Sequence, residues 1–298
     1  MKTRLFTLTL VLLAVAVTAQ AYTLQQNFNV DPFSNGWTAD VGTSGSAFMY
    51  NTTNNVSGTA GYLDCTVWRN NTATGLAHAY IPINQTYLMP NGQNGSATVN
   101  DIWIGFDMQF GSGAYSTQQS AIGILNSAQT YANTSTQNTL GLTTYKAASG
   151  LQVHSETING AGQYVNGFVT TNLATIADQV TRRYQAHYYI SEGKVYADVK
   201  VGTYNDATGL FTANVFSQNG ILVYDSAVSW DTVGMNALGI KNLAMTKGTS
   251  KAVKFVIDNM YFSTDSEQSM TVPSWVVPEP ATIAILALGG LLIRRKRN

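Results

Sequence analysis

Two-residue alternation of apolar and polar side chains dominates the middle of this chain. The clearest case is residues 101–110, where every second side chain is large and apolar. Those apolar side chains are Ile102, Ile104, Phe106, Met108 and Phe110. Such alternation is typical of a β-strand with one face in a hydrophobic core. Similar runs predict strands at 121–125, 139–143, 151–156, 180–190, 195–201, 221–225, 238–243 and 253–262.

No stretch between residues 22 and 264 shows a long apolar period of about 3.6 residues, so no core helix is expected. Segments rich in Gly, Asn and Ser separate the predicted strands. They are residues 42–61, 91–100, 111–120, 129–138 and 202–220. Many short strands joined by such loops predict an all-β fold, a two-sheet antiparallel β-sandwich of the jelly-roll type. We assign residues 22–265 to this one domain, because about 240 residues is an ordinary length for it.

One hairpin can be placed in register from the sequence. A tight turn at Glu192-Gly193 joins two alternating runs, and such a turn fixes which residues face each other. The inner face then pairs Tyr188 with Ala197, Ala186 with Val199, and Tyr184 with Val201. The outer face pairs Tyr189 with Tyr196, His187 with Asp198, and Gln185 with Lys200. The register is chemically consistent, because one face is apolar and the other is polar or aromatic.

The outer face of this hairpin is the first candidate binding site. Sugars present apolar C–H faces to aromatic rings and hydroxyls to polar groups, so aromatic side chains beside an imidazole, a carboxylate and an amide suit carbohydrate. The non-core face of residues 101–110 has the same character. The candidate ligand-binding residues are Trp103, Asp107, Gln109, His187, Tyr189, Tyr196 and Asp198. The alternative is that these pairs only stabilise a solvated sheet, by a few tenths of a kcal/mol each.

Residues 1–21 have the three parts of a secretory signal. Two basic residues precede an apolar run at 8–17, and Ala19 and Ala21 form a small-x-small cleavage site. We therefore expect cleavage after Ala21, so that the mature chain starts at Tyr22. The apolar run is shorter than the roughly 20 residues that a spanning helix needs, which disfavours the alternative of a retained anchor.

The other end carries a second three-part signal at residues 278–298, after a linker at 266–277. Its members are Pro278, Glu279 and Pro280, the pair Gly289 and Gly290 within an apolar run at 281–293, and the basic cluster Arg294, Arg295, Lys296 and Arg297. In this order the segment resembles the C-terminus of PEP-CTERM proteins, which are bacterial exported proteins sorted by an exosortase. The resemblance implies an exosortase-type enzyme as a partner, cleavage near the Pro-Glu-Pro motif, and delivery to the cell surface or exopolysaccharide.

The length of the apolar run agrees with a transient anchor. Its thirteen residues, if helical, extend about 20 Å, which is short of a hydrocarbon core of about 30 Å. Basic residues stay on the cytoplasmic side, so the body would face outward. We expect export, transient inner-membrane anchoring through residues 281–293, and then a place at the cell surface or in the extracellular matrix. A plain C-terminal membrane tail without processing is the alternative.

Charge and cysteine content narrow the classes of partner. The chain has 16 basic and 16 acidic residues, but six of the basic ones and one acidic one lie in the two terminal signals. The body keeps ten basic residues against fifteen acidic ones, and this negative balance argues against nucleic acid as a partner. Cys65 is the single cysteine, so no internal disulfide can form, and its strand-like surroundings predict a buried, inert thiol.

Two short stretches give the body a family resemblance. Phe28-Asn29-Val30-Asp31-Pro32 with Gly36-Trp37, and the closing run 255–262, resemble the first and last strands of concanavalin A-like, laminin-G-like jelly rolls. The resemblance implies carbohydrate binding, which many members share, and hydrolysis, which some perform. It also implies neighbouring terminal strands, which would bring Asp31 and Asp258 together at a structural calcium. Calcium takes roughly six to eight oxygen ligands, so backbone carbonyls would have to complete such a site, and no other cofactor is expected.

Motifs for catalysis are missing from the body. A retaining glycosidase holds two carboxylates about 5 Å apart, but the glutamates Glu156, Glu192 and Glu267 have no acidic neighbour two or four residues away, except Asp265 beside Glu267 near the mature C-terminus. The three histidines lack zinc-site spacing, and no Gly-x-Ser-x-Gly sequence occurs. We therefore do not expect an enzyme. A carbohydrate-binding module is the favoured function, a structural surface or matrix protein that packs with copies of itself is the alternative, and a glycan hydrolase or lyase comes third.

Overall fold

The structure is a computed structural model of the 298-residue chain. It describes residues 22–41, 47–52, 61–68, 78–87, 101–111, 119–127, 139–145, 152–158, 164–169, 179–192, 194–205, 210–224, 235–243 and 252–265. These ranges contain fifteen strands and one 3-10 helix, η1 (Pro32–Ser34). The strands form two antiparallel sheets, which confirms the expectation of an all-β, two-sheet antiparallel sandwich.

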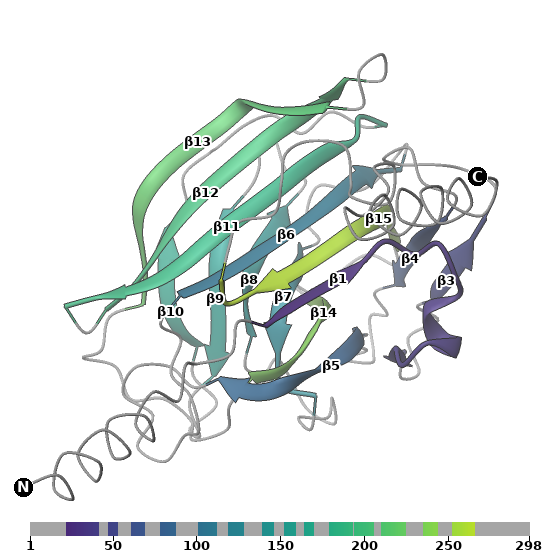
Figure 1. Cartoon of the computed structure of the whole chain (residues 1–298), viewed down its shortest axis with the longest axis horizontal. Helices are drawn as coiled ribbons and strands as arrows, with labels where there is room; N and C mark the ends of the chain where they lie inside the picture. The colour runs from purple at the N-terminus through teal and green to yellow at the C-terminus, as the bar shows by residue number, and fades with distance from the viewer. Residues whose placement is uncertain are drawn as a thin grey trace, which may run out of the picture.

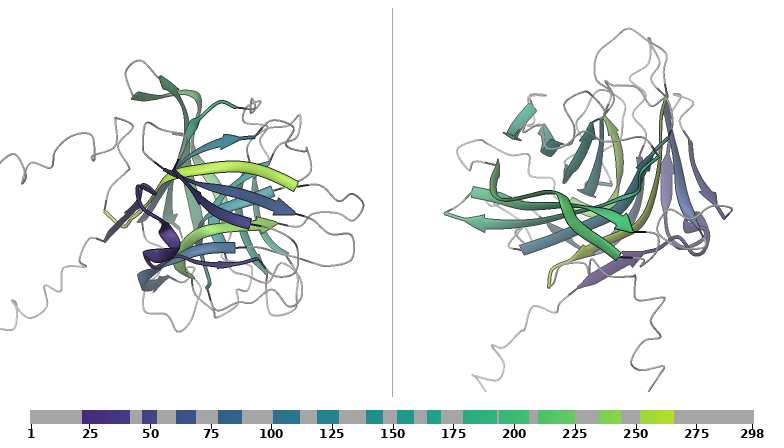
Figure 2. Two further views of the ribbon diagram at one scale, coloured as in Figure 1. Left: turned by 90° about the vertical axis from the view of Figure 1, so that its right-hand side faces the viewer. Right: turned by 90° about the horizontal axis from the view of Figure 1, so that it is seen from above.

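An eight-stranded sheet forms the front layer in Figure 1. Its strands in spatial order are β13 (Leu210–Tyr224), β12 (Lys194–Asn205), β11 (Arg182–Ser191), β6 (Asp101–Phe110), β15 (Ala252–Ser263), β4 (Tyr62–Trp68) and β3 (Ala47–Asn51), with β1 (Thr23–Gln26) beside β15. A seven-stranded sheet forms the second layer, which Figure 2 shows from two further directions. Its order is β10 (Tyr164–Val169), β9 (Gln152–Ile158), β8 (Thr139–Tyr145), β7 (Gln119–Leu125), β14 (Met235–Leu243), β5 (His78–Tyr87) and β2 (Thr38–Asp40).

The hydrophobic core lies between the two sheets. The five alternating apolar side chains of β6 point into it, and each is at most 2% exposed. The seven-stranded sheet contributes Ile122, Ile124, Leu140, Leu142 and Ile240 to the same buried cluster. Burying one such side chain stabilises the fold by about 1.5–3 kcal/mol, which favours regular alternation in β6. The other face of β6 points away from the core, and we call it the outer face of the eight-stranded sheet.

The hairpin of β11 and β12 has the register expected from the sequence. Tyr188 pairs with Ala197, and Tyr189 pairs with Tyr196. The inner side chains of the hairpin are buried, and Glu192 at the turn has a positive φ of 51°. The register was predictable because a slip of one residue would turn the whole buried face of the hairpin toward solvent.

Several strands differ from the sequence prediction. The sequence predicts a loop at 202–220, but β12 extends to Asn205 and β13 begins at Leu210. Ser217 and Asn219 on β13 are exposed, and the pairing with β12 contains register shifts, so no clean alternation marks this strand. Strand β3 likewise lies inside the loop predicted at 42–61. Strands β2, β5 and β10 were not predicted either.

The start of the body corrects the predicted first strand. Strand β1 precedes the Phe-Asp-Trp stretch and pairs with β15, so the terminal strands are neighbours as the resemblance implied. The stretch itself is not a strand, because Phe28 has a φ of +46° and Asp31 caps η1. Pro32 suits the first helical position after an Asp cap, since its φ is fixed and it has no N–H to satisfy. Phe28 and Trp37 still reach the core, with ring centroids 5.4 Å apart.

Both terminal signals lie outside the described residues. They comprise residues 1–21 with Ala19 and Ala21, the linker 266–277, and residues 278–298 with Pro278, Glu279, Pro280, Gly289, Gly290, Arg294, Arg295, Lys296 and Arg297. The hydrophobic helical segments expected at the two ends therefore stay predictions. Within the described part of the chain, no helix combines the length and hydropathy that crossing a bilayer requires.

Candidate functional site

Strands β6, β11 and β12 place five of the seven predicted ligand-binding residues together on the outer face. In the register of these strands, His187 lies between Trp103 on β6 and Asp198 on β12. Tyr189 lies one row further along, between Asp101 on β6 and Tyr196 on β12. Two cross-strand rows of aromatic and acidic side chains therefore adjoin each other, as the sequence predicted for β11 and β12.

Four of these side chains form what we call the aromatic ridge: Trp103, His187, Tyr189 and Tyr196. The indole and imidazole rings stack with centroids 4.3 Å apart and planes 2° apart. Tyr189 and Tyr196 stack at 5.9 Å and 23°, and His187 lies 5.1 Å from Tyr189. Because neighbouring strands are about 4.8 Å apart, rings that stack across them stand upright on the sheet. The ridge thus presents ring edges, hydroxyls and the outward ring faces at its ends.

One indole face points away from the ridge. The next positions in the row beyond Trp103 are Ser263 on β15 and Thr23 on β1. Their hydroxyls are 2.9 Å apart and hydrogen-bond to each other. Ser263 is 0% exposed, whereas Thr23 is exposed, so only the Thr23 end of this row is open to solvent.

Two carboxylates hold the ridge in place. Asp101 Oδ1 is 2.8 Å from Nε2 of His187, and Asp198 Oδ2 is 3.8 Å from its Nδ1. Asp198 Oδ1 also accepts hydrogen bonds from the Gly220 amide at 2.8 Å and from the Tyr189 hydroxyl at 3.4 Å. The exposed fractions of Asp101, Asp198 and His187 are 52%, 28% and 26%. The ridge is therefore fixed by several contacts and still open to solvent.

The Tyr189 hydroxyl stays protonated well into alkaline pH. Its pKa is raised by burial, by the negative charge of Asp198, by its hydrogen bond to Asp198 and by the neighbouring Tyr196. A protonated phenol donates a hydrogen bond and cannot act as a base. Tyr189 therefore contributes a ring and a hydroxyl to the ridge.

Asp107 corrects the sequence prediction, because it is not on an open surface. It lies on the outer face but is 0% exposed, and Arg183 beside it on β11 is 1% exposed. Arg183 donates from Nε at 2.6 Å and from Nη2 at 2.8 Å, and Asn259 Nδ2 donates to Asp107 Oδ2 at 2.8 Å. The alternation of side chains along β6 correctly predicted which face of the sheet carries Asp107, but it could not predict that Asp107 is buried there. The carboxylate is enclosed by the guanidinium and amide, so it holds β6, β11 and β15 together.

The two predicted calcium ligands have separate roles. Asp31 accepts hydrogen bonds from the Phe33 amide and the Ser34 hydroxyl, both at 3.0 Å, and so caps η1. Asp258 is buried and accepts from the Asn259 amide at 2.7 Å. In the residues that the structure describes, no three His, Cys, Asp or Glu side chains gather where they could hold a metal. The structural calcium stays a prediction.

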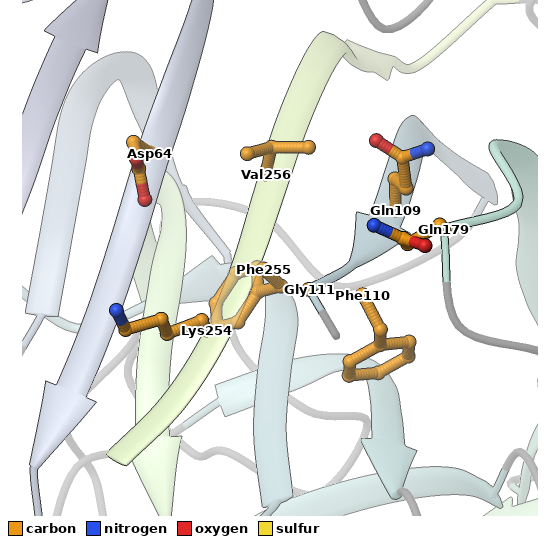
Figure 3. A pocket seen from close by; sticks show the side chains of 8 residues that line it. All are labelled: Asp64, Gln109, Phe110, Gly111, Gln179, Lys254, Phe255 and Val256. Carbon is orange, nitrogen blue, oxygen red and sulfur yellow. The ribbon is translucent and has the colours of Figure 1, made fainter. Parts of the chain in front are cut away.

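Gln109 lines a hollow of about 220 Å³ at the far end of β6 (Figure 3). The other lining residues are Asp64, Phe110, Gly111, Gln179, Lys254, Phe255 and Val256. Burial raises the pKa of the Asp64 carboxyl, and the charge of Lys254 lowers it in part. Sequence reasoning found only Gln109 here, because the hollow depends on β4, β15 and β6 being neighbours.

Sequence reasoning also missed Asp101, Arg183 and Asn259. Asp101 lies two positions before Trp103, and Arg183 lies four positions before His187. The two-residue alternation of a strand could therefore have placed both side chains on the outer face. Asn259 has a φ of +47° at an irregularity between β15 and β6, and no sequence pattern marks that position. Cys65 is fully buried, as predicted, and burial raises the pKa of its thiol.

No protein-family profile matches this sequence, and no curated protein is similar to it. Solved structures do resemble the fold. An endo-β-1,4-glucuronan lyase from the fungus Trichoderma reesei has a TM-score of 0.49 and 12% identity, with 81% of this chain and 94% of the lyase covered. An alginate lyase from Chlorella virus has a TM-score of 0.45 and 12% identity over 81% of this chain and 98% of its own.

A carbohydrate esterase from the Shiga toxin-encoding bacteriophage phi24B has a TM-score of 0.46 and 11% identity over 83% of this chain and 100% of its own. These three similar structures are thus two polysaccharide lyases and one carbohydrate esterase. At such identities and TM-scores, residue roles do not transfer, so the chemistry of the site follows from its own residues. This chain is an all-β protein of two antiparallel sheets with a fixed, half-exposed aromatic ridge on one outer face.

Proposed function

We propose that this protein is an exported glycan-binding protein of the cell surface or extracellular matrix, and that the aromatic ridge is its carbohydrate contact. The observation that carries the proposal is the stack of Trp103 on His187, which Asp101 holds and which stays partly open to solvent. A partly exposed indole suits the apolar face of a sugar ring. The exposed carboxylates of Asp101 and Asp198 suit its hydroxyls.

The ridge is preorganised for binding. Its rings are held by stacking and by hydrogen bonds to Asp101 and Asp198, so little side-chain freedom remains to be lost when a ligand binds. Aromatic side chains in fixed positions carry much of the binding energy at protein surfaces.

The proposal includes export and sorting. The signal at 1–21 and the PEP-CTERM-like segment at 278–298 support it, together with the acidic, hydroxyl-rich body between them. It also includes the jelly-roll connectivity. The support is that the chain crosses from one sheet to the other at each step from β5 to β6 to β7, and again from β13 to β14 to β15.

We further propose that the ridge binds glycans without cleaving them. Two features support this. Tyr189 has a raised pKa and so is unsuited to removing a proton. The ridge carboxylates Asp101 and Asp198 are held by His187, Tyr189 and the Gly220 amide, and the carboxylates further along the same face, Asp107 and Asp258, are buried.

The test is a binding panel of soluble neutral and acidic polysaccharides with the wild type, Trp103→Ala and Met49→Ala. Met49 is the matched control, because it is a large apolar side chain on β3 of the same outer face and is 54% exposed. We expect saturable binding that Trp103→Ala weakens at least about tenfold, or 1.4 kcal/mol, and Met49→Ala leaves unchanged. Binding to no polysaccharide, with concentration-dependent self-assembly instead, would favour the structural matrix protein. Release of shorter products from a bound polysaccharide would contradict binding without cleavage.

A further inference from the structure

A second feature of the outer face is a built hollow that the aromatic ridge does not include. We propose that the hollow lined by Asp64, Gln109, Gln179, Lys254 and Val256 is a separate site for one uncharged sugar unit. This inference rests on the proposed glycan-binding function, and it assigns a ligand class to a different place on the same sheet.

Three neighbouring strands form the floor of the hollow. Val256 on β15 is paired with Asp64 on β4 and with Gln109 on β6, so these three side chains make one cross-strand row on the outer face. Figure 3 shows Asp64, Val256 and Gln109 side by side across the three strands, with Gln179 next to Gln109. An apolar side chain thus lies between a carboxylate and two amides.

The walls of the hollow are fixed by the backbone. The Gln179 amide donates to the Phe110 carbonyl at 2.9 Å, and the Gly111 amide donates to the Lys254 carbonyl at 2.9 Å. Gln179 has a φ of +57°, a left-handed conformation that a residue with a side chain adopts at a cost of about 1 kcal/mol or more. Residues held in such conformations concentrate at binding sites.

The groups in the hollow match a neutral sugar. Asp64 can accept two hydroxyl hydrogens, and each amide can both donate and accept, which is what adjacent sugar hydroxyls need. Val256 offers a small apolar surface to ring C–H groups. The formal charges of Asp64 and Lys254 cancel, so the lining has no excess charge to compensate a uronate or an ammonium.

The size of the hollow and its distance from the ridge make it a site of its own. Its volume of about 220 Å³ is below the roughly 300–1,000 Å³ of sites for drug-sized ligands, so it takes one ring rather than a chain. Gln109 is six positions from Trp103 on β6, which is about 20 Å along the strand. A ligand in the hollow and a ligand on the ridge therefore perturb different residues.

The test is an NMR titration of the isotope-labelled full chain with methyl β-D-glucopyranoside, methyl β-D-glucuronoside and methyl β-D-glucosaminide. We expect the neutral glucoside to shift the amides of Gly111, Gln179 and Val256 in the wild type and equally in Trp103→Ala, because the hollow does not include Trp103. Gln109→Ala should weaken this binding at least about tenfold. Gln25→Ala is the matched control, since it removes an exposed amide on β1 of the same sheet and should change nothing.

A charge variant adds a readout that misfolding cannot imitate. Asp64→Asn leaves Lys254 as the single formal charge among the side chains lining the hollow, so this variant should bind the glucuronoside at least about tenfold more tightly than the wild type does. Equal binding of glucuronoside and glucoside by the wild type would overturn the inference.

The same inference is also overturned if polysaccharide binds through Trp103 while none of the three glycosides shifts the hollow. That outcome leaves the proposed function intact. Absence of binding to any polysaccharide refutes the proposed function instead, so the two failures are distinguishable.

Discussion

The buried ion pair of Asp107 and Arg183 allows a quantitative prediction. Asp107 receives three hydrogen bonds, two from the Arg183 guanidinium and one from the Asn259 amide, at 2.6–2.8 Å. Both charged side chains are at most 1% exposed, so removing either one takes a hydrogen-bonded opposite charge away from the other inside the protein. Breaking a buried pair in this way costs about 3–5 kcal/mol. We therefore expect Asp107→Leu and Arg183→Met each to lower the free energy of unfolding by about that amount.

The double replacement should behave differently. Replacing a buried pair by apolar residues of similar volume is often neutral or stabilising by about 1–4 kcal/mol, because the desolvation cost of both charges disappears. Asp107→Leu with Arg183→Met should therefore be far more stable than the sum of the single losses predicts. The expected coupling energy is at least about 3 kcal/mol.

Urea unfolding followed by circular dichroism and by tryptophan fluorescence measures all three variants. Coincident transitions from the two methods are needed before the free energies can be compared. Single losses below about 1 kcal/mol, or a double variant that loses the sum of the two, would refute the reasoning. Either result would mean that Asp107 and Arg183 are more hydrated in solution than their burial indicates.

Three further predictions follow from other residues. Tyr188→Phe should raise the melting temperature, because the Tyr188 hydroxyl is buried without a hydrogen-bond partner among the described residues and such a group costs about 1–3 kcal/mol; a lower melting temperature would contradict this. The pKa of the Asp64 carboxyl is higher in the folded protein than its unfolded-state value near 3.8. Asp64 therefore contributes most to stability below that value, and its contribution decreases as the pH rises through the folded-state pKa. Asp64→Asn should therefore flatten that part of the pH–stability profile measured by urea unfolding, and an unchanged profile would count against it. Mass spectrometry of the surface-released protein should find a chain that begins at Tyr22 and ends near Pro278, whereas an intact Asn298 would reject processing.

The sequence predicted the parts of the fold in which one face of a strand is buried. In β6 and in the β11–β12 hairpin, large apolar side chains alternate so regularly that only one register buries them all, and the outer faces followed at once. Strand β13 lacks this signal, because exposed polar side chains interrupt the alternation and bulges interrupt its pairing, and β3 has only five residues, of which Met49 is exposed. The segment 28–32 has strand-like residues, but Asp31 and Pro32 together favour a capped turn.

The sequence predicted which side chains of the candidate site share a face, and little more. Two-residue alternation along the strands placed Trp103, His187, Tyr189, Tyr196 and Asp198 on one face, and the structure brings them together. It could not distinguish the buried Asp107 from the half-exposed Trp103, because depth depends on what packs around each side chain. The hollow needed the order of β4, β15 and β6, which are far apart in the chain and are joined only by tertiary pairing.

The central claim is that the aromatic ridge holds carbohydrate. Isothermal titration of a polysaccharide from the binding panel into the wild type and into Trp103→Ala tests it most directly. We expect a saturable isotherm for the wild type and at least about a tenfold weaker one for the variant, with both proteins melting cooperatively. Identical isotherms for the two folded proteins would contradict the claim.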